Sequence, residues 1–230
     1  MTALDVLHCD NHLLAVVKPA CMPVVPDESG DRSLLDAAKA WVKREYDKPG
    51  EVFLGVVHRL DRPVSGIVVF GRTSKGAARL SEAWREGRVE KEYLAQSPLR
   101  VPLPAEAGTL QLWQRQDPQR NVVRVLGVAA EDEPSPHRDA KLAVTRWRVL
   151  ATDAEGTRLA LTPVTGRKHQ LRVACRHLGL PLAGDLKYGA EDALPDRSVA
   201  LHAWRLRVPH PTRDETLEFR SPPWWLPDGP

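Results

Sequence analysis

The chain contains 230 residues with a net charge of +3, and 42% of its residues are hydrophobic, so it can form one large domain or two subdomains around a proper core. Its cysteines (Cys9, Cys21 and Cys175) form no C-x-x-C pair, its histidines lack a metal-binding spacing, and no apolar run approaches the length of a membrane span. Charged residues occupy the place of a secretory signal, so we exclude a disulfide-rich secreted protein and expect a cytoplasmic protein without a metal site.

In the first half of the chain, apolar patterning predicts short strands and two helices. The predicted elements are a strand at 13–17, a helix from the cap Ser33 to about Tyr46, buried strands at 53–57 and 67–70, a helix that begins at Thr73 or Ser74 and stops at Gly87, and a strand at 89–95. Alternation along the last strand places Lys91, Tyr93 and Ala95 on one face.

The second half begins with a polar, proline-rich region. Residues 114–141 are polar and rich in charge and proline, and within this range we predict a mobile connection around 131–136 and one short strand at 122–126. A hairpin (142–150 and 157–163) and a helix at 167–178 follow, and Lys168, Arg172 and Arg176 would form a column on one face of this helix. Because strands outnumber helices and do not strictly alternate with them, the predicted fold class is α+β with a mainly antiparallel sheet.

The segment 58–66 places one carboxylate, Asp61, between Arg59 and Arg62 in the loop between two apolar runs. Gly66 allows the chain to turn back. Flanking cations favour the charged form of a carboxyl group, so this aspartate is a candidate nucleophile or base. The alternative is a structural turn whose aspartate is held in surface ion pairs.

Two stretches of the chain concentrate positive charge. Residues 58–100 contain nine lysines and arginines against five acids, and residues 158–177 contain five cations and no acid. Such clusters provide an electrostatic footprint for a polyanion. The alternative interpretation of these clusters is a solvated helix face without a binding partner.

Five motifs resemble, in their order, those of the RluA-like family of pseudouridine synthases. They are HRLDRPVSG (58–66), KEYLA (91–95), TGRKHQLRV (165–173), GLPLAGD with YG (179–185 and 188–189), and LHA with HP (201–203 and 210–211). Five ordered motifs identify a family far more specifically than any one of them.

The resemblance implies a long mixed, mainly antiparallel sheet in two subdomains, flanked by helices, with a central RNA-binding cleft. Residues 1–230 would form a single catalytic domain that isomerises uridine in tRNA or rRNA to pseudouridine. The family uses no cofactor and no metal. Since the chain starts at the catalytic module, without the S4-type RNA-binding domain of many relatives, we expect this domain to recognise its RNA itself, as a monomer with no obligatory protein partner.

The same resemblance implies roles for individual residues. Asp61 would be the essential catalytic residue, which either attacks the sugar carbon or removes a proton from it. Tyr93 would support the target uracil, and Arg172 would pair with the catalytic aspartate. The predicted substrate-binding residues are Arg59, which fills the space of a flipped-out base, Arg62, the phosphate contacts or supports Arg167, Lys168 and His169, and Leu201, which packs under the base. For His169 and His202, structural hydrogen bonding is favoured over chemistry.

Some positions depart from the family pattern. Val64 and Lys168 stand where threonine is common, and the segment 21–23 replaces a usual glycine-leucine pair. None of these changes removes a catalytic group, so they bear on the choice of target. Two other functions stay open: a noncatalytic RNA-binding or RNA-folding protein on the same fold, and a cofactor-free nucleosidase with Asp61 as nucleophile. The latter lacks a second carboxylate in a matching motif.

Overall fold

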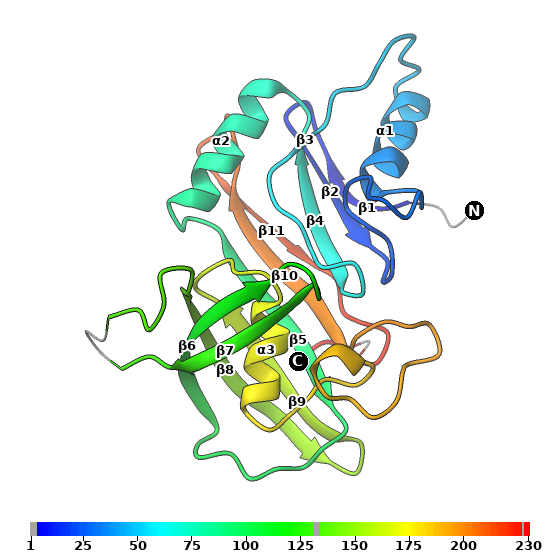
Figure 1. Cartoon of the computed structure of the whole chain (residues 1–230). Helices are drawn as coiled ribbons and strands as arrows, with labels where there is room; N and C mark the ends of the chain where they lie inside the picture. Colours follow the sequence, from blue (N-terminus) through cyan, green and yellow to red (C-terminus); the bar gives the residue numbers. More distant parts are fainter. Residues whose placement is uncertain (1–3, 131–133, 227) are drawn as a thin grey trace. The chain divides into compact units, whose positions relative to one another are not determined.

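The computed structural model describes residues 4–130, 134–226 and 228–230. The chain folds into two compact units, one formed by Met1–Lys91 with His202–Gly229 and the other by Glu92–Leu201. In Figure 1, the blue to cyan and orange to red parts of the ribbon belong mainly to the first unit, and the green to yellow part to the second. Both ends of the sequence therefore contribute to the first unit.

The first unit is built on a sheet with the strand order β1-β2-β4-β10, to which β3 adds on β4 and β11 on β10. The strands are β1 (Asp5–Cys9), β2 (Leu13–Lys18), β3 (Gly55–Val56), β4 (Ser65–Gly71), β10 (Leu201–Pro209) and β11 (Thr216–Arg220). The pair β4–β10 is parallel, and the other pairs are antiparallel. This parallel pair joins the two sequence segments of the unit.

Two helices of the first unit, α1 (Leu34–Glu45) and α2 (Ser74–Arg85), begin at the predicted caps. Ser33 and Asp36 form a reciprocal capping box, and the Thr73 hydroxyl accepts a hydrogen bond from the Gly76 amide (3.0 Å). Every second residue of β2 and β4 faces α2. The resulting core contains Leu13, Ala15, Ile67, Val69, Leu80, Ala83, Val89, Leu206, Val208 and Phe219.

The second unit contains an antiparallel sheet in the order β5-β9-β8-β6-β7. Its elements are β5 (Glu90–Ser97), β6 (Ala107–Asp117), β7 (Val122–Val128), β8 (Lys141–Asp153), β9 (Gly156–Pro163), α3 (Gln170–His177) and the 3-10 turn η1 (Leu186–Tyr188). Helix α3 covers one face of this sheet, where Val173 packs with Leu112, Val123 and Tyr188. The other face of β6, β7 and β8 carries the alternate side chains.

The predicted α+β class is confirmed, with a mixed and largely antiparallel arrangement of strands and helices on their flanks. The predictions for β2, α1, α2, β5 and the β8–β9 hairpin also hold. The predicted mobile connection includes residues 131–133, which lie outside the described residues. In the described ranges, none of the helices is both long enough and apolar enough to cross a membrane. The central cleft concerns the placement of the two units and stays a prediction.

One strand prediction is wrong, and one strand was not predicted. Residues 53–57 do not form a buried strand, because β3 pairs only with the last residues of β4, and Phe53 and Val56 are 52% and 37% exposed. Residues 114–117, which the polar pattern did not predict as a strand, belong to β6. Their pairing with β7 and β8 overrides their polar composition, since strand formation depends strongly on the partners available.

The predicted basic column on the last helix is also wrong. His169 adopts a left-handed backbone (φ 53°), so α3 begins only at Gln170 and Lys168 precedes the helix. Arg172 points into the protein and is buried, whereas Arg176 is exposed. The two arginines therefore do not share a solvent-facing surface.

Candidate active site

Asp61 is half-buried in the loop between β3 and β4. Its carbonyl oxygen accepts a hydrogen bond from the Val64 amide (3.0 Å), which closes a turn. After this turn, Gly66 has a φ of +118°, and a Cβ atom there would lie 2.4 Å from the carbonyl oxygen of Ala203 in β10. Only glycine allows β4 to begin this close to β10, so Gly66 fixes the point where the Asp61 loop joins the sheet.

A second anchor of this loop is Lys18, the last residue of β2, which is fully buried. Its Nζ atom donates hydrogen bonds to the carbonyl oxygens of Pro19 (2.9 Å), Met22 (2.8 Å) and Arg62 (3.0 Å). These bonds use all three N–H groups of a charged ammonium. The bond to Arg62 ties the chain after β2 to the residue that follows Asp61.

Lys18 also acts on Asp61 electrostatically. Burial lowers the pKa of Lys18 to about 7, and the interactions with Cys21 and Asp61 partly offset this effect. Arg59 and Arg62 are the cations that the motif predicts beside Asp61, and the motif does not include Lys18. A lysine at the end of an apolar strand could have indicated this role. Such a lysine is buried, and a buried ammonium requires a fixed set of acceptors.

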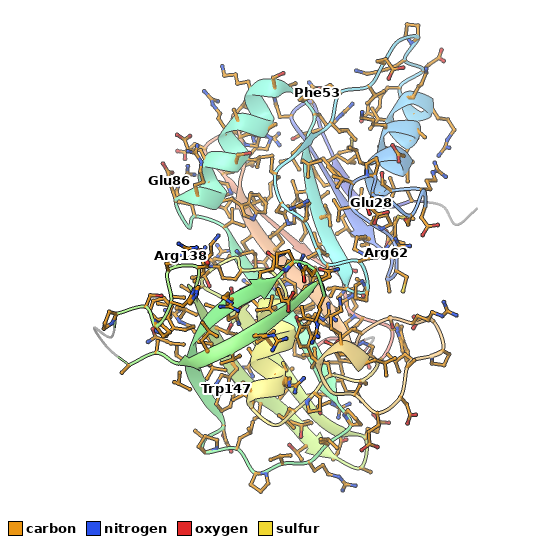
Figure 2. The ribbon with its side chains drawn as sticks, in the orientation of Figure 1. Glu28, Phe53, Arg62, Glu86, Arg138 and Trp147 are labelled. Carbon is orange, nitrogen blue, oxygen red and sulfur yellow. The ribbon has the colours of Figure 1, made fainter. Side chains whose placement is uncertain are left out.

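The two arginines beside Asp61 have different surroundings. Arg59 is exposed. The Nη1 atom of Arg62 lies 3.2 Å from Oδ2 of Asp27 and 2.8 Å from Oγ of Ser29, and its Nη2 atom pairs with Asp31. Figure 2 labels Arg62 in this loop and Glu28 in the acidic segment that contains these partners. The hydrogen bond with Asp31 raises the pKa of Arg62 above its ordinary value.

His58, at the start of the aspartate motif, is a structural anchor. Its Nε2 atom accepts a hydrogen bond from the Val69 amide in β4 (2.9 Å), so this nitrogen carries no proton. Its ring stacks on Trp84 of α2 with centroids 4.5 Å apart. Burial, with a smaller effect of Lys91, lowers the pKa of His58 to about 3.

His202, in the LHA motif, also makes structural hydrogen bonds, as expected. Its Nε2 atom lies 2.7 Å from the carbonyl oxygen of Ser221 and must donate to it, so Nδ1 accepts from the Ser65 hydroxyl (2.7 Å). Burial lowers the pKa of His202 to about 4 against the opposing effect of the Ser221 carbonyl. The histidine thus joins β4, β10 and the C-terminal segment.

The second unit contains the remaining predicted residues. Tyr93 is half-buried in β5, opposite Leu161 of β9. Leu201 is 3% exposed at the start of β10. Arg167 and Lys168 are exposed, and the Nε atom of Arg167 donates to the Leu142 carbonyl (2.9 Å).

Arg172 forms a buried ion pair with Asp185, in which the two side chains are 5% and 1% exposed. The Nε and Nη2 atoms of Arg172 donate to Oδ2 (2.8 Å) and Oδ1 (2.7 Å) of Asp185. This bidentate contact uses one edge of the planar guanidinium and fixes its orientation. Asp185 belongs to the GLPLAGD motif, which by itself predicts no role for it, although a buried arginine requires such a partner.

Aromatic and imidazole groups complete the surroundings of Arg172. Its guanidinium carbon lies 5.0 Å from the centroid of the Tyr188 ring. The Tyr188 hydroxyl accepts a hydrogen bond from the Val123 amide (2.9 Å) and lies 2.6 Å from Nδ1 of His169. His169 is buried, so the structure gives it this supporting hydrogen bond, as favoured from the sequence.

The predicted site residues therefore fall into two sets. The first unit holds Asp61, Arg59 and Arg62, and the second holds Tyr93, Arg167, Lys168, His169, Arg172 and Leu201. The pairing of Asp61 with Arg172 would join the two sets and stays a prediction. Among the described residues, no group of three or more His, Cys, Asp or Glu side chains could hold a metal ion.

The fold is that of the pseudouridine synthases. The solved structure of the human RNA pseudouridylate synthase domain containing 1 is similar, with a TM-score of 0.75 and 26% sequence identity. The likeness covers 98% of this chain and 85% of the human chain. It thus extends over both units and defines the class of protein.

Sequence comparison specifies the family. A family model described as RNA pseudouridylate synthase matches residues 12–177. The dual-specificity RNA pseudouridine synthase RluA of Haemophilus influenzae is 33% identical over 225 residues, which cover 95% of this chain and 92% of that protein. The tRNA pseudouridine synthase C of Haemophilus ducreyi is 33% identical over 90% of this chain and 86% of its own length. The chain belongs to the RNA pseudouridylate synthase family, which confirms the resemblance and makes it an isomerase that acts on RNA.

Proposed function

We propose that this protein converts specific uridines in structured tRNA or rRNA to pseudouridine, with Asp61 as its catalytic carboxylate. The observation that carries this proposal is the fixed loop of the family's aspartate motif. Gly66, Lys18 and His58 each attach that loop to the sheet or to a neighbouring segment. A catalytic group held in this way loses little freedom when the substrate binds.

The reaction rearranges bonds within one nucleotide. The N-glycosidic bond breaks, the uracil turns, a bond forms from C5 to the sugar carbon, and the hydrogen lost from C5 is balanced by one gained at the freed nitrogen. Asp61 either forms a transient bond to the sugar carbon or removes a proton from it. Neither route consumes water or a cofactor.

The target uridine must leave its stack before Asp61 can reach the glycosidic bond. We assign Arg59 to the space that the base vacates, because its exposed guanidinium can stack and hydrogen-bond at once. Tyr93 supports the uracil face in any orientation of the base, and Leu201 packs under it. Arg62, Arg167 and Lys168 contact phosphates. For Arg62 this requires exchange of its exposed ion pairs with Asp27 and Asp31, which stabilise the free protein little.

Arg172 is proposed to hold Asp61 ionised. Asp185 occupies the Nε and Nη2 edge of its guanidinium, so the Nη1 side is the one assigned to Asp61. In this arrangement a single buried cation orients the catalytic carboxylate and is itself oriented by a second carboxylate. Asp185 is then a positioning residue.

The products of a reaction with unmodified RNA distinguish this function from the others. Purified protein is incubated with tRNA and rRNA transcripts, which are digested to nucleosides and separated by chromatography with mass detection. Pseudouridine of unchanged mass is expected. Release of free uracil would indicate a nucleosidase, and binding without any new nucleoside would indicate a noncatalytic RNA-folding protein. We further expect a monomer in a reducing cytoplasm, where Cys9, Cys21 and Cys175 stay free thiols, as they are in the structure.

A further inference from the structure

One face of the second unit carries four exposed arginines that the reaction does not use. The face of β6, β7 and β8 opposite α3 is here called the outer face. Leu112, Val123 and Thr145 point toward α3, since the first two belong to its core cluster and Thr145 hydrogen-bonds Gln170 of that helix (3.0 Å). Alternation then places four exposed arginines on the outer face, namely Arg115, Arg124, Arg146 and Arg148.

These arginines are arranged unfavourably for stability. Arg115 and Arg124 are direct partners across β6 and β7, and like charges in such a position repel. Arg146 lies between Thr109 of β6 and Thr162 of β9, neither of which can neutralise it.

Among the described residues, few acidic side chains lie on this face. Asp117 pairs with Arg124 at 3.4 Å. Within the described part of the chain, Arg115, Arg146 and Arg148 form no ion pair with an acidic side chain. The described residues of this face therefore carry more positive than negative charge.

The charges lie at two ends of the face. Arg146 pairs with Thr109, which is six residues before Arg115 on the same strand, so the ends are about 20 Å apart at ~3.4 Å per residue. The residues between them are uncharged: Gln111 is exposed, and the half-buried Trp113 lies between Gly127 and Leu142. A double-helical RNA has a matching pattern, because two phosphate backbones flank a groove.

We propose that the outer face binds a helical stem of the substrate RNA through its phosphates, in addition to the binding of the target uridine. This inference rests on the proposed function, in which the substrate is a structured RNA. Each arginine pair contacts one phosphate backbone, and the neutral strip with Trp113 faces the groove. Contacts of this kind position an RNA without reading its sequence.

Two double variants test the proposal, Arg146→Gln with Arg148→Gln and Arg115→Gln with Arg124→Gln. The control is Arg44→Gln with Arg85→Gln, which removes the same charge from exposed helix positions of the first unit. Affinity is measured against salt for a short duplex RNA and for a single-stranded oligouridylate of equal length. Thermal unfolding verifies folding, and Arg115→Gln with Arg124→Gln should unfold at the same or a higher temperature because it removes a like-charge contact.

Each outer-face variant should bind the duplex at least fivefold more weakly near physiological salt. The slope of log affinity against log salt should decrease by about 2, since each lost phosphate contact contributes ~0.9. The affinity of each outer-face variant for oligouridylate should change less than twofold. The affinity of the control variant for the duplex should also change less than twofold. Unchanged duplex affinity and slope in both variants would overturn the proposal, as would an equal loss in the control or an equal loss for oligouridylate. If the wild-type protein forms no pseudouridine on unmodified RNA, the proposed function is refuted instead.

Discussion

At the scale of single residues, Lys18 is the anchor on which the Asp61 loop depends. Lys18→Met removes three hydrogen bonds and leaves buried carbonyl oxygens without a donor, which costs on the order of 1–3 kcal/mol for each such group. We expect a lower unfolding temperature and a fall in single-turnover rate of at least tenfold, with RNA affinity changed less than threefold. Lys18→Arg keeps a buried cation and should recover part of the rate. A folded Lys18→Met variant with the wild-type rate would show that the anchor does not serve catalysis.

The buried pair Arg172–Asp185 gives a second residue-scale prediction. Arg172→Leu leaves the buried carboxylate of Asp185 without this partner and should lower the free energy of unfolding by ~3–5 kcal/mol. Asp185→Leu removes the bidentate acceptor of the Arg172 guanidinium and should also destabilise the protein. The double variant should be more stable than the sum of the two losses predicts, as a double-mutant cycle in urea would measure.

The rate of pseudouridine formation distinguishes a structural role of the Arg172–Asp185 pair from a catalytic one. Without Arg172, the charged form of Asp61 loses its proposed partner, so the double variant should form pseudouridine far more slowly than the wild type. Asp185→Asn, which keeps Arg172, should retain more activity than either variant without the arginine. A double variant with the wild-type rate would show that Arg172 acts only through its pairing with Asp185.

At the scale of elements, His58 links the catalytic loop to β4 and α2 and makes this link sensitive to acid. Its pKa is about 3 in the folded protein and near its ordinary 6.5 in the unfolded chain, so the unfolded state takes up the proton first. The contribution of His58 to the free energy of unfolding is therefore fully present above about pH 6.5 and is lost as pH falls toward 3.

Thermal unfolding between pH 7 and pH 4 tests this link. The wild type should lose at least ~2 kcal/mol over this range. His58→Gln should be less stable at pH 7 and should show a smaller loss on acidification. The control His177→Gln, at an exposed position of α3, should follow the wild-type curve. Identical pH dependence in wild type and His58→Gln would contradict the assignment.

Local sequence patterns predicted the elements that depend on interactions between residues close in sequence. Ser33 and Thr73 cap their helices because their hydroxyls accept bonds from nearby amides, and β2 follows from an apolar run. The length of β3 and β6 was not predictable in this way, because partner strands far away in sequence decide where pairing ends. The start of α3 was not predictable either, because His169 adopts a left-handed backbone and its imidazole contacts Tyr188, 19 residues further along the chain.

The candidate site shows the same limit. Motifs predicted Asp61, Tyr93 and Arg172 as site residues, but they did not reveal what holds these side chains. Lys18 reaches the Asp61 loop across more than forty residues of sequence, since its bond to Arg62 spans 44 positions. The role of Asp185 as a partner follows from the burial of Arg172, which the motifs do not show.

At the scale of the whole molecule, binding to RNA should be strongly electrostatic although the net charge is only +3. The charge is concentrated in exposed arginines and lysines, including Arg59, Lys168 and the four arginines of the outer face. The affinity for unfractionated tRNA should fall linearly on a log–log plot against monovalent salt, with a slope near the number of phosphate contacts. A nearly flat dependence would point to a small-molecule substrate.

The central claim is that Asp61 performs the isomerisation, and Asp61→Asn tests it most directly. The substitution keeps the size of the side chain and removes its charge. Single-turnover formation of pseudouridine is measured with wild type and variant on the same transcript, and affinity for this RNA is measured in parallel. The variant should form no detectable pseudouridine and should bind the RNA within about tenfold of the wild type, a difference of ~1.4 kcal/mol. Pseudouridine formation by folded Asp61→Asn at a rate close to that of the wild type would contradict the account.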